Sequence, residues 1–321
     1  MAAFVVAASP LESIPIALRA AWLREHHSQP HVEIVPAVDD IPVDYDSDTT
    51  WAAHVAVFRA AAGGPVDVVF SSEEYGPELA RRLDAVHVPG DPARERFPVS
   101  GTAVRADPVA CWEWLSPAVR AHLARRVVVV GAESSGTTTL ARALASHYAR
   151  RGGVWAATRW VAEYGRLYCE EKLAVAHRRD PNLWLGDLGW TSEEFIVIAE
   201  RQLAWEESAA RSGSPLLVCD TDAFATELWH ERYVGTPAPH LARTHHDLWI
   251  LTDTTGVPFE QDGWRDGEAV REEMSARFAA ELECRGLPHV VVSGPHDKRL
   301  YEAVEAIDAL IAKGWTFTEP R

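Results

Sequence analysis

The chain has 321 residues and a net charge of −16, with 47% hydrophobic and 24% charged residues. This composition is that of a globular protein and excludes a disordered or collagen-like chain. No apolar run approaches the roughly 20 residues that a membrane helix needs, so no membrane span is expected. Because so acidic a chain repels a phosphate backbone, a nucleic-acid partner is not expected either.

The chain has four cysteines, none of them in a CxxC pair: Cys111, Cys169, Cys219 and Cys284. The sequence therefore predicts neither a disulfide framework nor a zinc site, and it favours a reducing, cytoplasmic compartment. The apolar start lacks a basic region, so a secretory signal is not expected. The pairs His26-His27 and His245-His246 have no third partner at metal-ligand spacing and are interpreted as ordinary polar residues.

In the first half, short β-branched runs alternate with stretches rich in Ala, Leu and Arg. This alternation is typical of parallel sheets covered by helices. Strands are expected at 4–8, 31–38, 66–71 and 85–88. Helices are expected at 15–25, 50–61 and 77–83, and a Pro- and Arg-rich loop is expected at 90–98.

A second series of the same kind begins at residue 126. After a first strand at 126–131, buried strands are expected at 216–222, 248–253 and 289–294. Helices are expected at 137–150, 191–211, 268–285 and 298–312. The sequence thus predicts two α/β domains, and we place the boundary between residues 124 and 125.

The most specific motif is the segment VVVVGAESSGTTTLARALASHY, in which an apolar strand leads through a glycine-bounded loop into an amphipathic helix. The pattern GxxxxGK[ST] in this setting forms a phosphate-binding loop, because backbone N–H groups and a helix N-terminus surround an anion. Thr138 occupies the position whose hydroxyl binds Mg²⁺. The residues expected to bind ATP are Gly131, Glu133, Ser134, Ser135, Gly136, Thr137, Thr138 and Thr139.

Position 137 is Thr where this motif has Lys. That lysine ordinarily reaches the β and γ phosphates and offsets charge during transfer. Either another cation replaces it or the chain transfers phosphate slowly, and a non-catalytic nucleotide binder is a further alternative. Since the chain has three lysines among 31 basic residues, an arginine is the expected substitute.

Acidic residues follow the strand at 216–222, at its carboxyl end. A kinase needs carboxylates there to hold Mg²⁺ and to accept a proton from the substrate. Asp220 is predicted to be catalytic and a metal ligand, and Asp222 is predicted to act with it, because alternate strand residues face the same way. Asp222 fits equally well as the N-cap of a helix that begins at Ala223.

Two further segments carry charged residues of interest. Glu163, Tyr164 and Arg166 suit a nucleoside substrate, although a structural ion pair is an equal alternative. Arg265 and Arg271 lie in or after a glycine-bounded loop that suits a closing lid, the alternative being a solvated turn. Both are predicted to be catalytic, because either arginine could supply the charge that Thr137 does not.

Several aromatic residues are able to stack on a flat ring, but their spacing does not choose among them: Trp160, Tyr164, Trp184 and Trp190.

The runs GAESSGTTTLA, AEYGRLYCEEKL, VCDTDAFAT and QDGWRDG, in that order, resemble the ribosylnicotinamide kinase domain of NadR-type bifunctional enzymes. The resemblance covers about residues 126–310. It implies ATP- and Mg²⁺-dependent phosphorylation of nicotinamide riboside to nicotinamide mononucleotide in NAD biosynthesis. A kinase of another small nucleoside and a nucleotide-binding regulator are the alternatives, and a homo-oligomer is left open. Where the family often has a ring-stacking Trp, this chain has Ala162.

The segments FSSEEYGPELARRL, FPVSGTAVRADP and WEWLSP resemble, more faintly, the later part of the family's nicotinamide-mononucleotide adenylyltransferase domain. The resemblance implies that Ser100, Gly101, Thr102 and Arg105 contact ATP phosphates. The His-x-Gly-His segment of that domain is not found in this sequence. Either the true start lies upstream of this sequence or the domain has lost its adenylyl-transfer chemistry. We therefore expect an incomplete Rossmann-like nucleotidyltransferase domain at 1–124, without adenylyl transfer by this chain, and a P-loop kinase domain at 125–321.

Overall fold

The computed structural model describes residues 2–239, 241, 245–260 and 268–318. The chain forms two compact units. The first comprises Met1–Ser116 with Trp315–Arg321, and the second comprises Pro117–Gly314. The division thus falls before the helix at 117–123, whereas the sequence analysis placed it after that helix, and the last residues of the chain return to the first unit.

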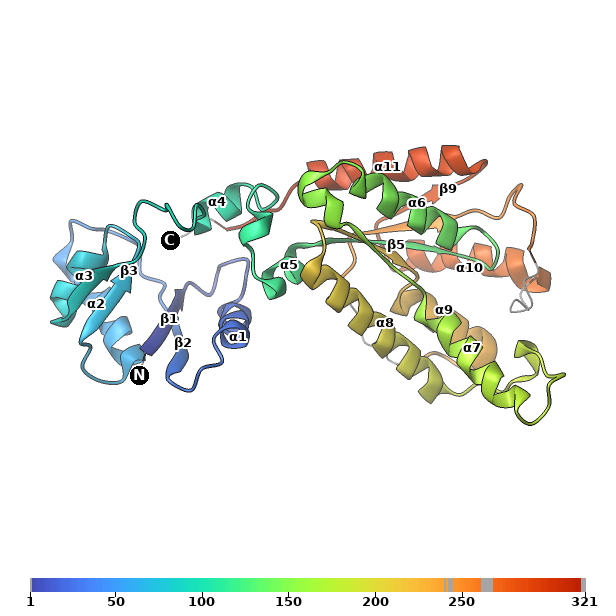
Figure 1. Cartoon of the computed structure of the whole chain (residues 1–321), viewed down its shortest axis with the longest axis horizontal. Coiled ribbons are helices and arrows are strands. Elements are labelled where there is room, and N and C mark those ends of the chain that lie inside the picture. The colour runs from blue at the N-terminus through green and yellow to red at the C-terminus, as the bar shows by residue number, and fades with distance from the viewer. Residues whose placement is uncertain (1, 240, 242–244, 261–267, 319–321) are drawn as a thin grey trace. The chain divides into compact units, whose positions relative to one another are not determined.

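The first unit contains two pairs of parallel strands with helices between them (Figure 1). β1 pairs with β2 and β3 pairs with β4. Its small core joins Trp51, Val55 and Leu79, with Phe58 and Leu83 packed against them. In chain order the elements are β1 (Ala2–Ala8), α1 (Ile16–His26), β2 (Val32–Val38), α2 (Asp48–Ala62), β3 (Val68–Ser71), α3 (Gly76–Leu83), β4 (Val86–Pro89) and α4 (Gly101–Ala106).

The second unit is built on a parallel five-stranded sheet with the strand order β6-β7-β5-β8-β9. Its strands are β5 (Arg125–Gly131), β6 (Arg159–Val161), β7 (Leu216–Asp220), β8 (Leu248–Thr252) and β9 (His289–Val292). Its helices are α5 (Pro117–Leu123), α6 (Thr137–Ala149), α7 (Tyr164–His177), α8 (Ser192–Ser212), α9 (Ala223–Val234), α10 (Arg271–Cys284) and α11 (His296–Ala312).

Helices cover both faces of this sheet, with α6 and α11 on one face and α8 and α9 on the other (Figure 1). The main core lies on the α6 side, where Val127, Val129, Leu216, Val218 and Ile250 are all fully buried. Because side chains alternate along a strand, the residues between them face α8 and α9. Sheet strands buried on both faces read as continuous apolar runs, which is why the sequence revealed them.

The strands and helices expected from the sequence are present in the structure within a few residues of their expected ends. The expected fold class, two α/β domains with a parallel sheet in the second, is confirmed. The region from 91 to 99 contains no helix or strand, in agreement with the expected loop. No helix in the described ranges is long and apolar enough to cross a membrane.

Candidate functional site

The loop between β5 and α6 has the backbone form of an anion-binding loop. Ser134 and Gly136 have positive φ angles of 60° and 90°. Helix α6 then begins at Thr137, on the central strand's carboxyl side. Because the first N–H groups of a helix have no intrahelical partner, this end presents donors and the positive end of the helix dipole.

Gly131 is needed where the loop leaves the sheet. A Cβ atom added to it would lie 2.6 Å from Ser135 Oγ and 3.0 Å from the Thr252 carbonyl oxygen. Ser135 Oγ itself donates to the Ala132 carbonyl at 2.6 Å and shares a hydrogen bond of 2.6 Å with Thr252 Oγ1. The loop therefore folds back onto β8 too closely for any side chain at position 131.

Two buried arginines donate hydrogen bonds to the backbone of the loop. Arg271 donates to the carbonyl oxygens of Glu133 at 3.1 Å and Ser134 at 2.9 Å, and to that of Val257 at 2.8 Å. Arg299 donates to the Ser135 carbonyl oxygen at 2.7 Å. Three consecutive loop carbonyls thus have guanidinium partners.

The catalytic prediction for Arg271 is not supported by this placement, because its guanidinium is engaged by backbone oxygens rather than directed into the pocket. Arg299 was missed. It lies more than 150 residues after the loop and carries no local motif that would single it out. Arg265, the other predicted lid residue, lies outside the described residues.

Asp220 ends β7 beside the start of α6 and is 2% exposed. Burial raises the pKa of this carboxyl to about 6, although hydrogen bonds with Thr138 and Thr137 and the charges of Arg142 and Arg166 act in the opposite direction. The structure therefore brings Asp220 together with Thr137 and Thr138. A carboxylate beside a hydroxyl at a phosphate loop is a hard oxygen donor set, which suits Mg²⁺.

Asp222 faces a different environment. Strand β7 ends at Asp220 and Thr221 has a φ of 74°, so the alternation of the strand stops there. The Asp222 carboxylate caps α9 by accepting from Ala225 N at 2.9 Å, and it accepts from Trp249 Nε1 at 2.9 Å. It is not among the pocket-lining residues, so the helix-cap interpretation fits and the catalytic one does not.

A pocket opens over the loop and Asp220. Glu163 and Arg166 line it, but Tyr164 does not, because its ring packs edge-on against Trp205 at 5.0 Å. Of the four aromatic residues considered for stacking, Trp190 is a lining residue. The remaining aromatic wall was missed by the sequence analysis, and it comprises Phe195, Trp229, Tyr233 and Phe278.

These aromatic side chains form one contiguous cluster. The Trp190 ring lies 5.5 Å from that of Phe195 and 5.6 Å from that of Tyr233. They come from α8, α9, α10 and the segment before α8, so no local pattern in the sequence connects them. Lys172 Nζ lies over Trp190 and binds the Glu194 carboxylate at 2.7 Å. That ion pair joins α7 to α8.

The phosphate motif expected in the first unit forms the short helix α4. Ser100 caps it by accepting from Ala103 N at 3.0 Å. Thr102 is exposed and Arg105 is half-buried, with its guanidinium near Gly101. The phosphate role of Ser100, Thr102 and Arg105 stays a prediction.

The sheet order, the loop and the flanking helices define a P-loop α/β protein. Residues 126–299, a little more than half of the chain, match a family model described as AAA domain, and the chain belongs to that family. The predicted relationship to NadR-type proteins is confirmed. Over 272 residues the chain is 26% identical to the trifunctional NAD biosynthesis/regulator protein NadR of Escherichia coli K12, matching 82% of this chain and 62% of that protein.

Two solved structures share the fold across both units. One is NadR protein in complex with NR, with a TM-score of 0.71 and 19% identity, covering 99% of this chain and 89% of that one. The other is NadR protein in complex with NAD and AMP-PNP, with a TM-score of 0.70 and 19% identity, covering 96% and 87%. The chain spans less than two thirds of the length of the curated relative, so the activity of that whole protein does not transfer with the fold.

Proposed function

We propose that the second unit transfers the γ-phosphate of ATP to the 5′-hydroxyl of nicotinamide riboside, giving nicotinamide mononucleotide. The observation that carries the proposal is the meeting of buried Asp220 with Thr137 and Thr138 at the phosphate loop, in one pocket with Glu163 and Arg166. The similar NadR structure is described as a complex with NR, and another as a complex with NAD and AMP-PNP, which supports the same ligands here.

Each group has a role that its chemistry suits. The loop N–H groups and the α6 N-terminus hold the phosphates. Asp220, whose pKa is raised to about 6, accepts the proton of the attacking hydroxyl as the new O–P bond forms and the bond to the leaving ADP breaks. Thr138 and Asp220 would hold Mg²⁺, which when bound offsets phosphate charge. The aromatic wall and Glu163 suit a flat, positively charged nicotinamide ring.

A nucleotide binder without turnover is the second candidate, and one observation favours it. Among the described residues that line the pocket, Arg166 is the only basic one. Position 137 offers a hydroxyl instead of an ammonium group, so the charge developing on the transferring phosphate has few partners. An arginine from the predicted lid, Arg265, is the cation that we propose to complete the site.

A phosphotransfer assay with ATP, Mg²⁺ and nicotinamide riboside tests the proposal. We expect mononucleotide and ADP in equal amounts, with Thr138→Ala strongly reduced and the exposed Ser212→Ala, on the same unit, unchanged. A panel of other nucleosides identifies a different substrate if nicotinamide riboside is inactive. ATP binding by calorimetry without turnover on any nucleoside would establish the binder instead.

We further propose a small molecule as the physiological partner and the cytoplasm as the location. The thiols support the latter, because none of the four cysteines is in a disulfide, including the exposed Cys284. Structural disulfides are the rule in oxidising compartments. Labelling of Cys284 by a thiol reagent in freshly lysed cells is the expected result, and a blocked thiol would contradict this location.

A further inference from the structure

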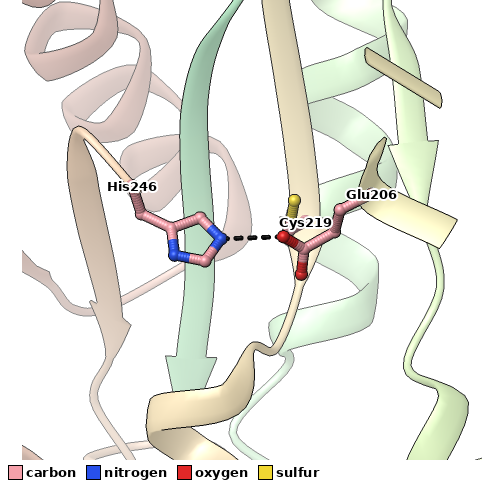
Figure 2. Close-up of side chains that lie close together, drawn as sticks. All are labelled: Glu206, Cys219 and His246. Carbon is pink, nitrogen blue, oxygen red and sulfur yellow. Dashed lines mark hydrogen bonds and ion pairs between the residues drawn. The ribbon is translucent and has the colours of Figure 1, made fainter. Parts of the chain in front are cut away.

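Three buried side chains meet on the face of the sheet that α8 covers. Glu206 comes from α8, Cys219 from β7, and His246 from the segment before β8. One potential ligand atom from each lies within 4.8 Å of the other two. Figure 2 shows the imidazole and the carboxylate directed toward one another, with the sulfur atom beside the carboxylate, and His246 Nε2 lies 2.9 Å from Glu206 Oε2.

This cluster is separate from the kinase site. None of the three residues lines the pocket over the phosphate loop. Cys219 precedes Asp220 on β7, and because neighbouring strand residues face opposite ways, it is directed to the α8 side while Asp220 reaches the loop. Glu206 and Cys219 are fully buried, and His246 is 6% exposed. Polar groups buried so deeply need a compensating interaction.

We propose that Glu206, Cys219 and His246 form a binding site for a single zinc ion. Thiolate, imidazole and carboxylate are the three ligand types that zinc takes in proteins. His246 contributes Nε2, Cys219 its Sγ atom, and Glu206 one carboxylate oxygen, with its second oxygen completing four ligand atoms. Bound there, the ion would join α8 to β7 and to the segment before β8.

The other ring nitrogen of His246 supports this assignment. His246 Nδ1 lies 3.6 Å from Asp222 Oδ2. A metal-binding histidine typically has its second nitrogen opposite a carboxylate, which fixes the ring and its tautomer. Asp222 is itself held by Trp249 and by the α9 cap, so it is able to serve as this orienting group.

The charges of the cluster also accommodate a dication. The carboxylates of Glu206 and Asp222 both lie beside the imidazole of His246, and Arg126 Nη1 lies 3.8 Å from Glu206 Oε2. A dication placed between these side chains would have carboxylate oxygens as partners, and it would displace the proton of the Cys219 thiol on binding.

Metal retention by the full chain tests the site. The purified protein is loaded with one equivalent of zinc, passed through a desalting column and analysed for metal. We expect about one zinc per chain in the wild type and in Cys284→Ala, which removes an exposed thiol. Cys219→Ala should bind zinc at least tenfold more weakly, and Asp222→Asn about 10- to 100-fold more weakly. Equal retention by Cys219→Ala and wild type, or none by either, overturns the proposal.

Cobalt substitution provides a readout on the wild type alone, in case the variants do not fold. A Co²⁺ ion bound by a thiolate has a sulfur-to-metal charge-transfer absorption in the near ultraviolet. We expect this band in the wild type and its displacement by added zinc. A folded wild-type chain without the band would show that Glu206, Cys219 and His246 form a metal-free polar network. Neither outcome depends on whether the phosphate loop supports transfer.

Discussion

At the scale of single residues, Asp220 is a buried carboxyl group whose ionisation lowers the stability of the fold. Its pKa is about 6 in the folded chain because of burial, against an ordinary value of 3.8. The folded state thus binds this proton more tightly than the unfolded state, so the free energy of unfolding falls as pH rises from about 4 to 6 and then stays level. A shift of two units corresponds to about 3 kcal/mol.

Asp220→Asn should therefore stabilise the protein while abolishing phosphate transfer. Without ATP and Mg²⁺ we expect the melting temperature to rise by several degrees at pH 7.5 and to change little at pH 4, since the carboxyl is already protonated there. The exposed Asp297→Asn is the control and should give no rise. A lower melting temperature for Asp220→Asn at pH 7.5 would mean that the charged carboxylate is favourably paired.

Gly131 is the residue whose replacement should most directly distort the loop. A Cβ atom there meets Ser135 Oγ at 2.6 Å, so Gly131→Ala must displace the loop or β8. We expect a loss of about 1–3 kcal/mol in the free energy of unfolding and much weaker ATP binding, by denaturant titration and calorimetry. Gly189→Ala, with no atom within 4 Å of the added methyl, is the matched control. Wild-type ATP affinity in Gly131→Ala would show that the loop adapts.

At the scale of elements, α10 and α11 act on the phosphate loop through Arg271 and Arg299. Their guanidinium groups donate hydrogen bonds to the carbonyl oxygens of Glu133, Ser134 and Ser135, which fixes the backbone of the loop. Arg299→Met keeps the apolar stem but leaves buried carbonyls without partners, at about 1–3 kcal/mol. We expect ATP to bind about tenfold more weakly, with a smaller fall in kcat at saturating ATP.

Lys298→Met is the control for this variant, since Lys298 is the neighbouring residue on α11 and pairs with Glu302 on the surface. It should bind ATP as the wild type does. The same measurements on Arg271→Met decide between positioning and catalysis. A kcat reduced a thousandfold with unchanged ATP affinity would indicate that Arg271 reaches the transferring phosphate after all.

The sequence predicted elements and motifs well where the signal is local. Buried parallel strands are continuous apolar runs, and the loop combines two glycines with a helix start, so β5, β7 and the Gly131–Thr138 segment were found. The sequence did not predict the sites that are assembled from distant segments. Arg299 and Trp229 reach the pocket region only through the fold, and the spacing of Glu206, Cys219 and His246 along the chain resembles no metal motif. Asp222 was misassigned because Thr221 breaks the strand alternation.

At the scale of the whole molecule, the two units have separate cores. The main core, which includes Val127 and Ile307, lies entirely within Pro117–Gly314. The described residues that line the pocket over the loop lie in the same unit. The core around Trp51 and Leu79 belongs to the first unit.

A ligand stabilises the state that it binds, so ATP with Mg²⁺ should raise the unfolding temperature of the second unit and leave that of the first unchanged. Calorimetric scans with and without nucleotide resolve the two transitions, and an equal rise in both would show that the units unfold together.

A fragment of residues 117–314 should consequently fold and retain the proposed phosphotransfer. It keeps α5, whose Ala118, Ala121 and Leu123 are buried, and it keeps Gly314, whose carbonyl oxygen is bound by Arg125. Starting the fragment at residue 125, the boundary expected from the sequence, removes α5 and exposes the side of α8 that it covers. We expect kcat/KM for nicotinamide riboside within about twofold of the full chain for 117–314, and lower solubility and melting temperature for 125–314. A tenfold loss in the longer fragment, at an unchanged melting temperature of the second unit, would show that the first unit contributes to the reaction.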